Sequence, residues 1–334
     1  MFKDLRMRCG VRIRPRFVLA SLGLAISCSS TTAVPAQQLM RWKFQPGQQF
    51  DVQVTQRMEM EATLLDRPIR SVSETTMHLE WAVQAVDQAG TADVRQTFRR
   101  VKMTMDMPGV PAVEYDSASP AKPTGMARSL ADQVGPMIGA AFEQTMTTRG
   151  EVLSVTPTAE TLARFEKAAG GGSAPGGLSE ESLKGLLNQT AAALPEHAVK
   201  PGDTWQGQAV TQSPVGALKM DVTYTLAGQE VRDGRPLERI DVEVKLSIEP
   251  GEDPATIKVA VAAQESKGVM LFDAQAGRFV ETNMHQKMTL ATTVGDQEMR
   301  QKVAHATRMT VTPSVAEAAQ PPAKAAPPAD PAGK

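Results

Sequence analysis

Apolar and polar residues alternate with a period of two along much of this 334-residue chain. Successive side chains of a β-strand point to opposite faces of its sheet, so the alternation predicts strands with one dry and one wet face. From Phe50 to Ala62, apolar residues hold most even positions and polar residues hold the odd ones. The same pattern recurs over residues 77–85, 94–107, 220–226, 240–248, 257–261, 280–290 and 299–311. We therefore expect about ten long strands in one antiparallel sheet.

Turn residues separate these stretches and divide the chain into hairpins. Asp233-Gly234, Pro250-Gly251 and Gly295-Asp296 are typical of tight turns between antiparallel strands. In the 94–107 stretch the apolar residues change from even to odd positions at Arg99-Arg100. A phase change of one residue predicts a β-bulge at that point.

The middle of the chain is expected to be helical. Apolar residues recur at helical spacing from Ala127 to Phe142, although Gly135-Pro136 should kink that helix. Thr156-Pro157 is predicted to open a second helix, and a third should begin at Ser179 and run to about Leu194. The Gly-rich residues 170–177 read as a linker.

Together these patterns predict an α+β fold. The large antiparallel sheet should be curved and half-barrel-like, with two or three helices on its concave face. Its two related halves begin alike, at Pro46-Gly47 and at Pro201-Gly202. The expected organisation is a single β-rich domain over 37–312, followed by a disordered Ala/Pro tail over 313–334. Within the domain we place the first half at 40–156, a helical and linker segment at 157–198, and the second half at 199–312.

Residues 1–36 resemble a signal sequence. Six basic residues precede an uncharged stretch over 17–27 that is too short for a transmembrane helix, which needs about 20 apolar residues. Two processing routes remain open: lipidation at Cys28, or cleavage after Ala36. Cleavage is favoured because Ala25 stands where a lipidation signal usually has Leu. Either route predicts an exported protein of the periplasm or cell envelope, without a transmembrane segment in the mature chain.

Cysteine usage and charge exclude several classes of protein. Both cysteines, Cys9 and Cys28, lie in the amino-terminal segment, so the mature chain would have no disulfide and no catalytic thiol. Losing that segment removes six basic residues and one acidic residue from a chain of net charge −1. The clearly negative remainder would repel nucleic acid, so no nucleic-acid partner is expected.

No motif specifies a reaction. The four histidines, His78, His197, His285 and His305, show no metal-ligand spacing, and no Gly-x-Ser-x-Gly motif is present. We therefore predict that the protein is not an enzyme and needs no cofactor and no metal ion.

The 18 methionines suggest instead an adaptable apolar surface. Three interpretations are open: a packed core between sheet and helices, a pocket for an acyl chain or other apolar ligand, and a Cu(I) site. Val and Leu residues occupy many of the apolar positions between the methionines, so the sulfur atoms are not clustered, which disfavours a copper site. The candidate ligand lining consists of Met58, Met60, Trp81, Phe98, Met103, Met105, Met137, Ile138 and Phe142.

Several of these features together resemble a known family. The signal sequence, the two Pro-Gly openings, the residues 149–152 after the first helix and the 272–279 hairpin are similar to a family of exported bacterial proteins. That family is known only as a domain of unknown function, and the resemblance spans roughly residues 40 to 312. It implies no catalytic residue.

The expected architecture is also similar to the half-barrels of lipoprotein carriers of the LolA and LppX type. That likeness implies a non-enzymatic envelope protein that binds or carries a lipid or lipid-modified protein between sheet and helices. The alternative is a structural or protein-interaction module with a sealed core and no ligand. The sequence does not specify the oligomeric state.

Overall fold

The computed structural model describes residues 37–64, 67–168, 193–213, 216–249, 257–294 and 297–314. These residues form a single sheet of twelve strands, all antiparallel to their neighbours. The strands are β1 (Gln49–Leu64), β2 (Arg67–Val86), β3 (Ala92–Met107), β4 (Val110–Asp116), β5 (Ala141–Met146), β6 (Val152–Pro157), β7 (Thr204–Ser213), β8 (Gly216–Arg232), β9 (Arg235–Glu249), β10 (Ile257–Asp273), β11 (Arg278–Val294) and β12 (Gln297–Pro313).

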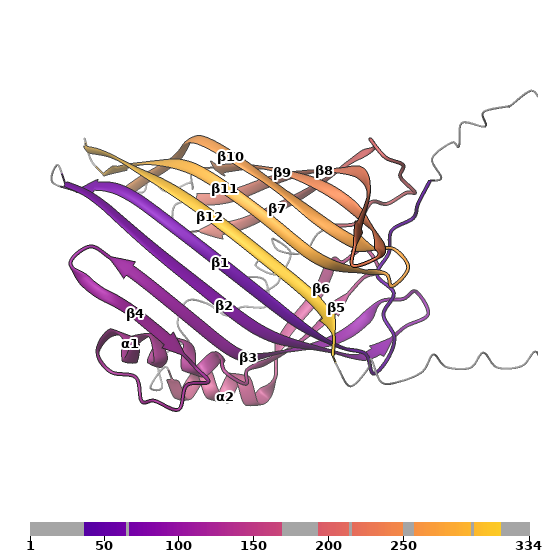
Figure 1. Ribbon diagram of the computed structural model, residues 1–334, viewed down its shortest axis with the longest axis horizontal. Coiled ribbons are helices and arrows are strands. Elements are labelled where there is room, and N and C mark those ends of the chain that lie inside the picture. Colours follow the sequence, from indigo (N-terminus) through magenta and orange to yellow (C-terminus); the bar gives the residue numbers. More distant parts are fainter. Residues whose placement is uncertain are drawn as a thin grey trace, which may run out of the picture. The chain divides into compact units, whose positions relative to one another are not determined.

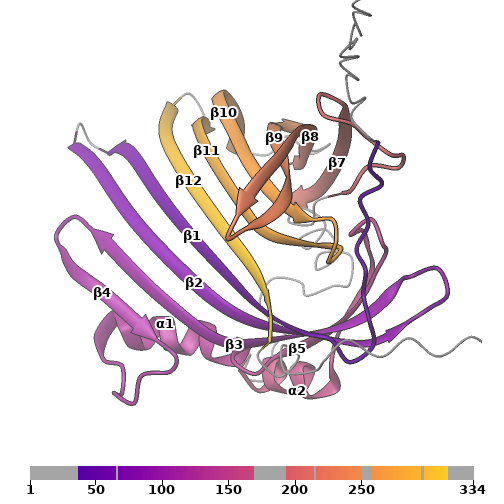
Figure 2. The same cartoon turned by 45° about the vertical axis from the view of Figure 1, so that its right-hand side comes forward.

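The strand order is β6-β5-β3-β2-β1-β12-β11-β10-β9-β8-β7, and β4 pairs with β3 beside this path. The first and last strands therefore pair in the middle of the sheet, from Phe50 opposite Pro313 to Ala62 opposite Gln301. Figures 1 and 2 show the sheet strongly twisted and curved, with β1–β3 on one side of the curve and β8–β10 on the other.

The strand register places the alternating apolar residues on one face. Val52 lies opposite Leu79 of β2 and Val311 of β12, and directly opposed residues of an antiparallel pair point to the same side. Buried side chains from β1 and β9, such as Phe50 and Ile240, belong to one hydrophobic cluster, so this face lines the inside of the curve. We call it the concave face and its opposite the convex face.

The predicted bulge and one predicted turn are confirmed. His78 of β2 pairs with Arg100 while the next residue, Leu79, pairs with Phe98, which leaves Arg99 as the extra residue of β3. Asp233 and Gly234 both have positive φ, at 50° and 74°, as a two-residue hairpin between β8 and β9 requires. The predicted turns at Pro250-Gly251 and Gly295-Asp296 lie outside the described residues.

The expected α+β fold with helices covering the concave face is wrong. The described residues are mainly β, and their only α-helices are α1 (Gly125–Val134) and α2 (Ala159–Ala168). Helix α1 lies against β4, and α2 lies against β5 and the short 3-10 helix η1 (Gly135–Met137) (Figure 1). Both are therefore at the margin of the sheet.

The helix expected over 127–142 ends early for a local reason. Pro136 cannot donate a helical hydrogen bond, and the chain turns through η1 and Gly139, whose φ is +79°. Phe142 then lies in β5 rather than in a helix. The second helix is confirmed, but Thr158 caps it: its Oγ1 accepts a hydrogen bond from the Thr161 N–H at 3.3 Å. The linker over 170–177 and nearly all of the third helix lie outside the described residues.

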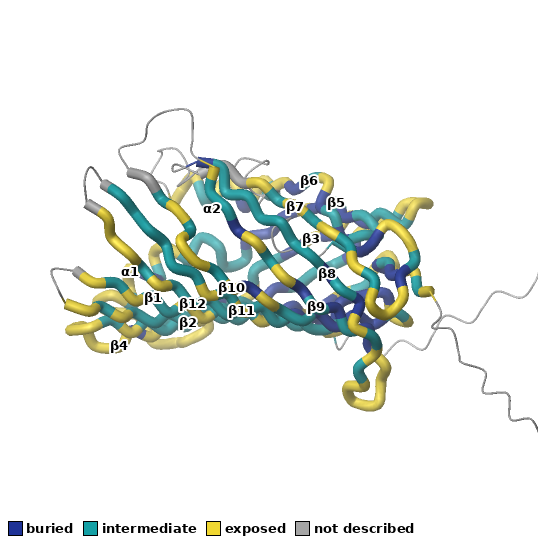
Figure 3. Tube along the Cα trace, turned by 90° about the horizontal axis from the view of Figure 1, so that it is seen from above, coloured by how far each residue is buried: buried dark blue, intermediate teal, exposed yellow. Residues whose placement is uncertain are grey.

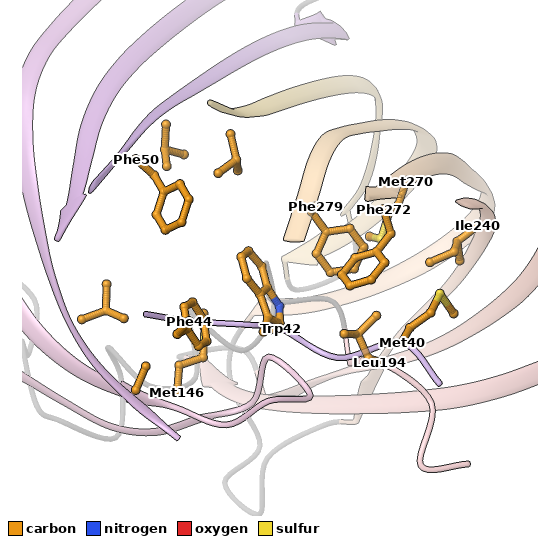
Figure 4. Packing of buried hydrophobic residues seen from close by; sticks show 14 of the residues in the cluster. Met40, Trp42, Phe44, Phe50, Met146, Leu194, Ile240, Met270, Phe272 and Phe279 are labelled. Carbon is orange, nitrogen blue, oxygen red and sulfur yellow. The ribbon is translucent and has the colours of Figure 1, made fainter. Parts of the chain in front are cut away.

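Among the described residues, extended segments fill one end of the concave face. Met40, Trp42 and Phe44 point into the curve from the segment 37–48, and Leu194 joins them from the segment 193–199 (Figure 4). Trp42 stacks on Phe44 at 5.1 Å between ring centroids. We call residues 37–48 the amino-terminal strap.

Backbone hydrogen bonds hold the strap from three sides. The Trp42 N–H donates to the Thr148 carbonyl at 2.8 Å, and the Lys43 N–H donates to the Gly277 carbonyl at 2.9 Å. Gln38 exchanges two backbone hydrogen bonds with Val199. In Figure 3, buried residues gather at one end of the sheet, and partly exposed residues lie at the other.

Candidate functional site on the concave face

The buried cluster under the strap ends part-way along the strands. Its outermost members on β1, β11 and β12 are the partly buried Val54, Met284 and Met309. Beyond these residues the strands continue, and β1 runs on to Leu64. The side chain of Met58, in this part of β1, is 46% exposed. We call the concave-face residues beyond Val54, Met284 and Met309 the open half.

Apolar side chains continue across the open half. Met60 of β1 lies opposite Val303 of β12, which in turn lies opposite Met288 of β11. Met105 of β3 lies opposite Val113 of β4 at one side, and Leu246 of β9 lies opposite Met220 of β8 at the other. Val113 and Leu246 are buried, whereas Met60, Met105, Met220, Met288 and Val303 are partly exposed and extend over strands from both halves of the chain.

The convex face of the same strands is charged. Glu59 accepts hydrogen bonds from Arg57 at 2.9 Å and from Arg70 at 2.8 Å. These two hydrogen bonds hold the pKa of the Glu59 carboxyl below its usual value. Alternation thus separates a solvated ion-pair surface from an apolar one within single strands.

The nine residues of the predicted lining divide into three groups. Met58, Met60, Met103 and Met105 lie on the concave face in or beside the open half, as the register of β1, β2 and β3 requires. Trp81, Phe98 and Phe142 are on the same face but pack in or against the buried clusters. The Trp81 Nε1–H donates to the Gln96 Oε1 at 2.9 Å, and the Phe98 and Phe142 ring centroids are 6.0 Å apart.

Met137 and Ile138 lie in the turn that follows α1. The Ile138 carbonyl accepts a hydrogen bond from Arg164 of α2 at 2.6 Å, and the neighbouring Gly139 N–H donates to the Phe98 carbonyl at 2.7 Å. This places the two residues beside the Phe98–Phe142 pair, at the side of the sheet where α2 packs.

Two parts of the site were missed in the sequence. The strap alternates Met40, Trp42 and Phe44 with polar residues, and this signal was available but short. The lining from β11 and β12, Met288 and Val303, was also visible as alternation. Neither could be assigned to the same surface as Met58 without knowing that β1 pairs with β12.

Two cavities among the described residues lie outside the open half. One of about 260 Å³ lies between the strap and the β10–β11 turn, with Trp42, Phe50 and Arg278 in its wall. The other, of about 390 Å³, lies between the end of β4 and α1. Among the residues that the structure describes, no group of three or more His, Cys, Asp or Glu side chains is arranged to hold a metal ion. None of the described helices is both long and apolar enough to span a membrane.

A comparison with models of protein families shows which family the chain belongs to. The model of a family described as a family of unknown function (DUF6263) matches residues 89–277, which is more than half of the chain. The chain belongs to the DUF6263 family. The predicted relationship to a domain of unknown function is thereby confirmed, while the likeness to LolA- and LppX-type carriers is not shown by any of these comparisons. The search of curated proteins found no match.

Several solved structures resemble this DUF6263 chain weakly. A lipovitellin structure described by its lipid–protein interactions has a TM-score of 0.45 and 11% identity, over 80% of this chain and 25% of the lipovitellin chain. This chain therefore spans about a quarter of that relative. A protein from Bacteroides fragilis, described as exported and YmcC-like in fold, has a TM-score of 0.19 and 8% identity over 82% of this chain and 97% of its own. The translocator domain of the autotransporter NalP from Neisseria meningitidis has a TM-score of 0.21 and 7% identity over 80% of this chain and 89% of its own. We draw neither fold nor function from likenesses at these scores.

Proposed function

We propose that this protein is a non-enzymatic, exported envelope protein that binds a lipid or another apolar ligand on the open half of its concave face. The observation that carries the proposal is the separation of the sheet into a charged convex face and a mainly apolar, uncharged concave face, of which the strap fills one end among the described residues. Export rests on the sequence of residues 1–36.

Physical chemistry supports a ligand for this surface. Each large apolar side chain that moves from water into an apolar contact gains about 1.5–3 kcal/mol. Contiguous apolar surface on a protein is therefore costly unless something binds to it. Met58, Met60 and Met288 add flexible thioether side chains, which adapt to ligands of irregular shape.

The alternative function is a structural or protein-interaction module with a sealed core. The strapped end of the concave face supports that alternative, because less than a tenth of the surface of Trp42, Phe50 and Phe279 is exposed there. The two functions differ in whether the open half accepts a small apolar molecule.

The test is equilibrium binding of N-phenyl-1-naphthylamine, an uncharged apolar dye whose fluorescence rises out of water. Ligand binding on the open half predicts saturable binding that Val303→Arg weakens, because the new charge would point into the apolar face. Ala304→Arg is the matched control, because Ala304 is the next residue of β12 and lies on the convex face opposite Glu59. Met58→Asn is a milder second variant, since Met58 is already half exposed.

Circular dichroism and melting temperatures establish that each variant is folded. Weaker dye binding in Val303→Arg and Met58→Asn, with unchanged binding in Ala304→Arg, supports the proposal. The absence of saturable binding to the wild-type protein, or equal effects of the three substitutions, overturns it in favour of the sealed module.

A further inference from the structure

Uncharged polar side chains form a band on the concave face, at the border between the strapped end and the open half. The strand register places its members on the concave face of five neighbouring strands, β2, β1, β12, β11 and β10. We call these residues the polar band: Gln56, Ser73, Thr75, Ser266, Gln286, His305 and Thr307. Ser266 is buried, and the other six are partly exposed.

The band follows two adjacent cross-strand rows. In the first row, Ser73 lies opposite Met58, Met58 opposite His305, His305 opposite Gln286, and Gln286 opposite Ser266. Directly opposed side chains of antiparallel strands are close enough to act on one ligand together.

The second row lies one step toward the strap. There Thr75 lies opposite Gln56, which lies opposite Thr307. The Thr307 hydroxyl and the His305 Nε2 are 3.4 Å apart, which joins the two rows.

Apolar rows flank the band on both sides. On the side of the strap, Val54 lies opposite Met77 and Met309. On the outer side, Val303 lies opposite Met60 and Met288, and this row ends in the polar residues Ser71 of β2 and Gln264 of β10. An apolar chain bound along a strand would therefore meet apolar, then polar, then apolar surface.

The band and its flanking rows contain no Lys, Arg, Asp or Glu among the described residues. The charged residues of these strands, such as Arg57, Lys287 and Lys302, occupy the convex positions. Burial lowers the pKa of His305, so that its imidazole is uncharged at neutral pH. A charged ligand group would lose its water here without gaining an opposite charge, whereas an uncharged one can form hydrogen bonds.

We propose, on the basis of the proposed function, that the ligand is an uncharged long-chain ester such as an acylglycerol. Its ester and hydroxyl groups bind the polar band, and its hydrocarbon lies on the flanking apolar rows. The side-chain amide of Gln286 and the hydroxyl of Ser73 can both donate to ester oxygens, and the imidazole of His305 can donate or accept according to its tautomer.

The experiment compares three amphiphiles with the same twelve-carbon chain in displacing N-phenyl-1-naphthylamine from the purified protein. They are glycerol monolaurate, which is an uncharged ester, laurate and dodecyltrimethylammonium, each used below its critical micelle concentration. We expect glycerol monolaurate to displace the dye at a concentration roughly ten-fold lower than either charged compound requires. Equal or stronger displacement by laurate or by the ammonium compound overturns the inference.

Variants locate the effect on the band. Gln286→Leu keeps the size of the side chain but loses its hydrogen bonds, so we expect it to weaken glycerol monolaurate binding about five-fold more than it changes the separately measured affinity for the dye. His285→Leu is the matched control, because His285 is the preceding residue of β11 and lies on the convex face. Equal glycerol monolaurate affinities for Gln286→Leu and His285→Leu overturn the role of the band.

The two proposals can fail separately. If the dye itself does not bind, then both the proposed function and this inference fail. If the dye binds but the three amphiphiles displace it equally, only the ester inference fails.

Discussion

Gly268 shows how closely single residues fit on the concave face. It lies in β10 directly opposite Met284 of β11, near the border of the open half. A Cβ atom at this position would stand 2.1 Å from the Met284 sulfur and 2.5 Å from the Asn283 carbonyl oxygen. The sulfur belongs to a flexible side chain and can move, but the carbonyl oxygen is part of the β11 backbone. The glycine thus allows the Met284 side chain to lie across β10.

We predict that Gly268→Ala destabilises the fold by about 1–3 kcal/mol, because the new methyl group forces β10 and β11 apart. Chemical denaturation of wild type and variant measures this difference. Gly207→Ala is the matched control, since its Cβ would meet only the Tyr224 side chain, at 3.3 Å. A cost for Gly268→Ala no larger than that for Gly207→Ala would contradict the close approach of the two strands.

His305 links stability to pH. Burial lowers its pKa below the ordinary value of 6.5, and its described neighbours on the concave face, Met58, Gln286 and Thr307, are uncharged. The unfolded chain therefore binds the proton more readily than the folded protein does. This group reduces stability as the pH falls through 6.5, and its effect levels off below the folded-state pKa.

We predict that His305→Gln makes the protein less sensitive to acid between pH 7 and pH 5. The quantity to compare is the change in denaturation midpoint between these two pH values, in the variant and in wild type. His285→Gln serves as the control, because His285 is exposed on the convex face. An unaltered pH dependence in His305→Gln would show that the imidazole is not held in its neutral form by burial.

At the scale of elements, the long central strands followed from the sequence, whereas the short strands β4 to β7 and the cover of the concave face did not. Alternation is a local property, so it predicted the long strands, and the phase change at Arg99 predicted the bulge. What packs on a face depends on contacts between distant segments, such as Gln38 with Val199. The strap is short and forms no regular strand, so its periodicity was a weak signal.

In the candidate site too, residues within one strand could be predicted from the sequence, and residues brought together by strand pairing could not. Met58 and Met60 were found because their own strand carries the pattern, whereas their neighbours His305 and Val303 come from the other end of the chain. Pairing between β1 and β12 spans more than 230 residues of sequence, and no local propensity encodes it.

We predict that Trp42→Ala in the strap destabilises the fold by about 3–5 kcal/mol, as expected when a large buried aromatic residue is removed. Trp42 is 6% exposed and contacts the rings of Phe44, Phe279 and Trp81. Leu39→Ala is the control in the same segment, because Leu39 is 56% exposed. Similar melting temperatures for the two variants would mean that the strap does not stabilise the concave face.

At the scale of the whole molecule, the two ends of the described chain meet in the centre of one sheet. β1 and β12 join the strands of the first half to those of the second, so the concave face is continuous across both. The strap fills one end of this face, and the polar band lies between the apolar row of Val54, Met77 and Met309 and the outer residues Met60, Val303 and Met288. One surface thus combines a buried end, uncharged polar side chains and partly exposed apolar side chains.

The most direct test is photocrosslinking with an acylglycerol that carries a diazirine in its acyl chain, followed by peptide mass spectrometry. We predict adducts on concave-face residues of β1, β11 and β12, foremost Met58, Met288 and Val303, and their loss when excess glycerol monolaurate competes. Adducts confined to convex-face residues such as Arg57 or Lys287, or labelling that excess glycerol monolaurate does not reduce, would contradict a ligand site on the concave face.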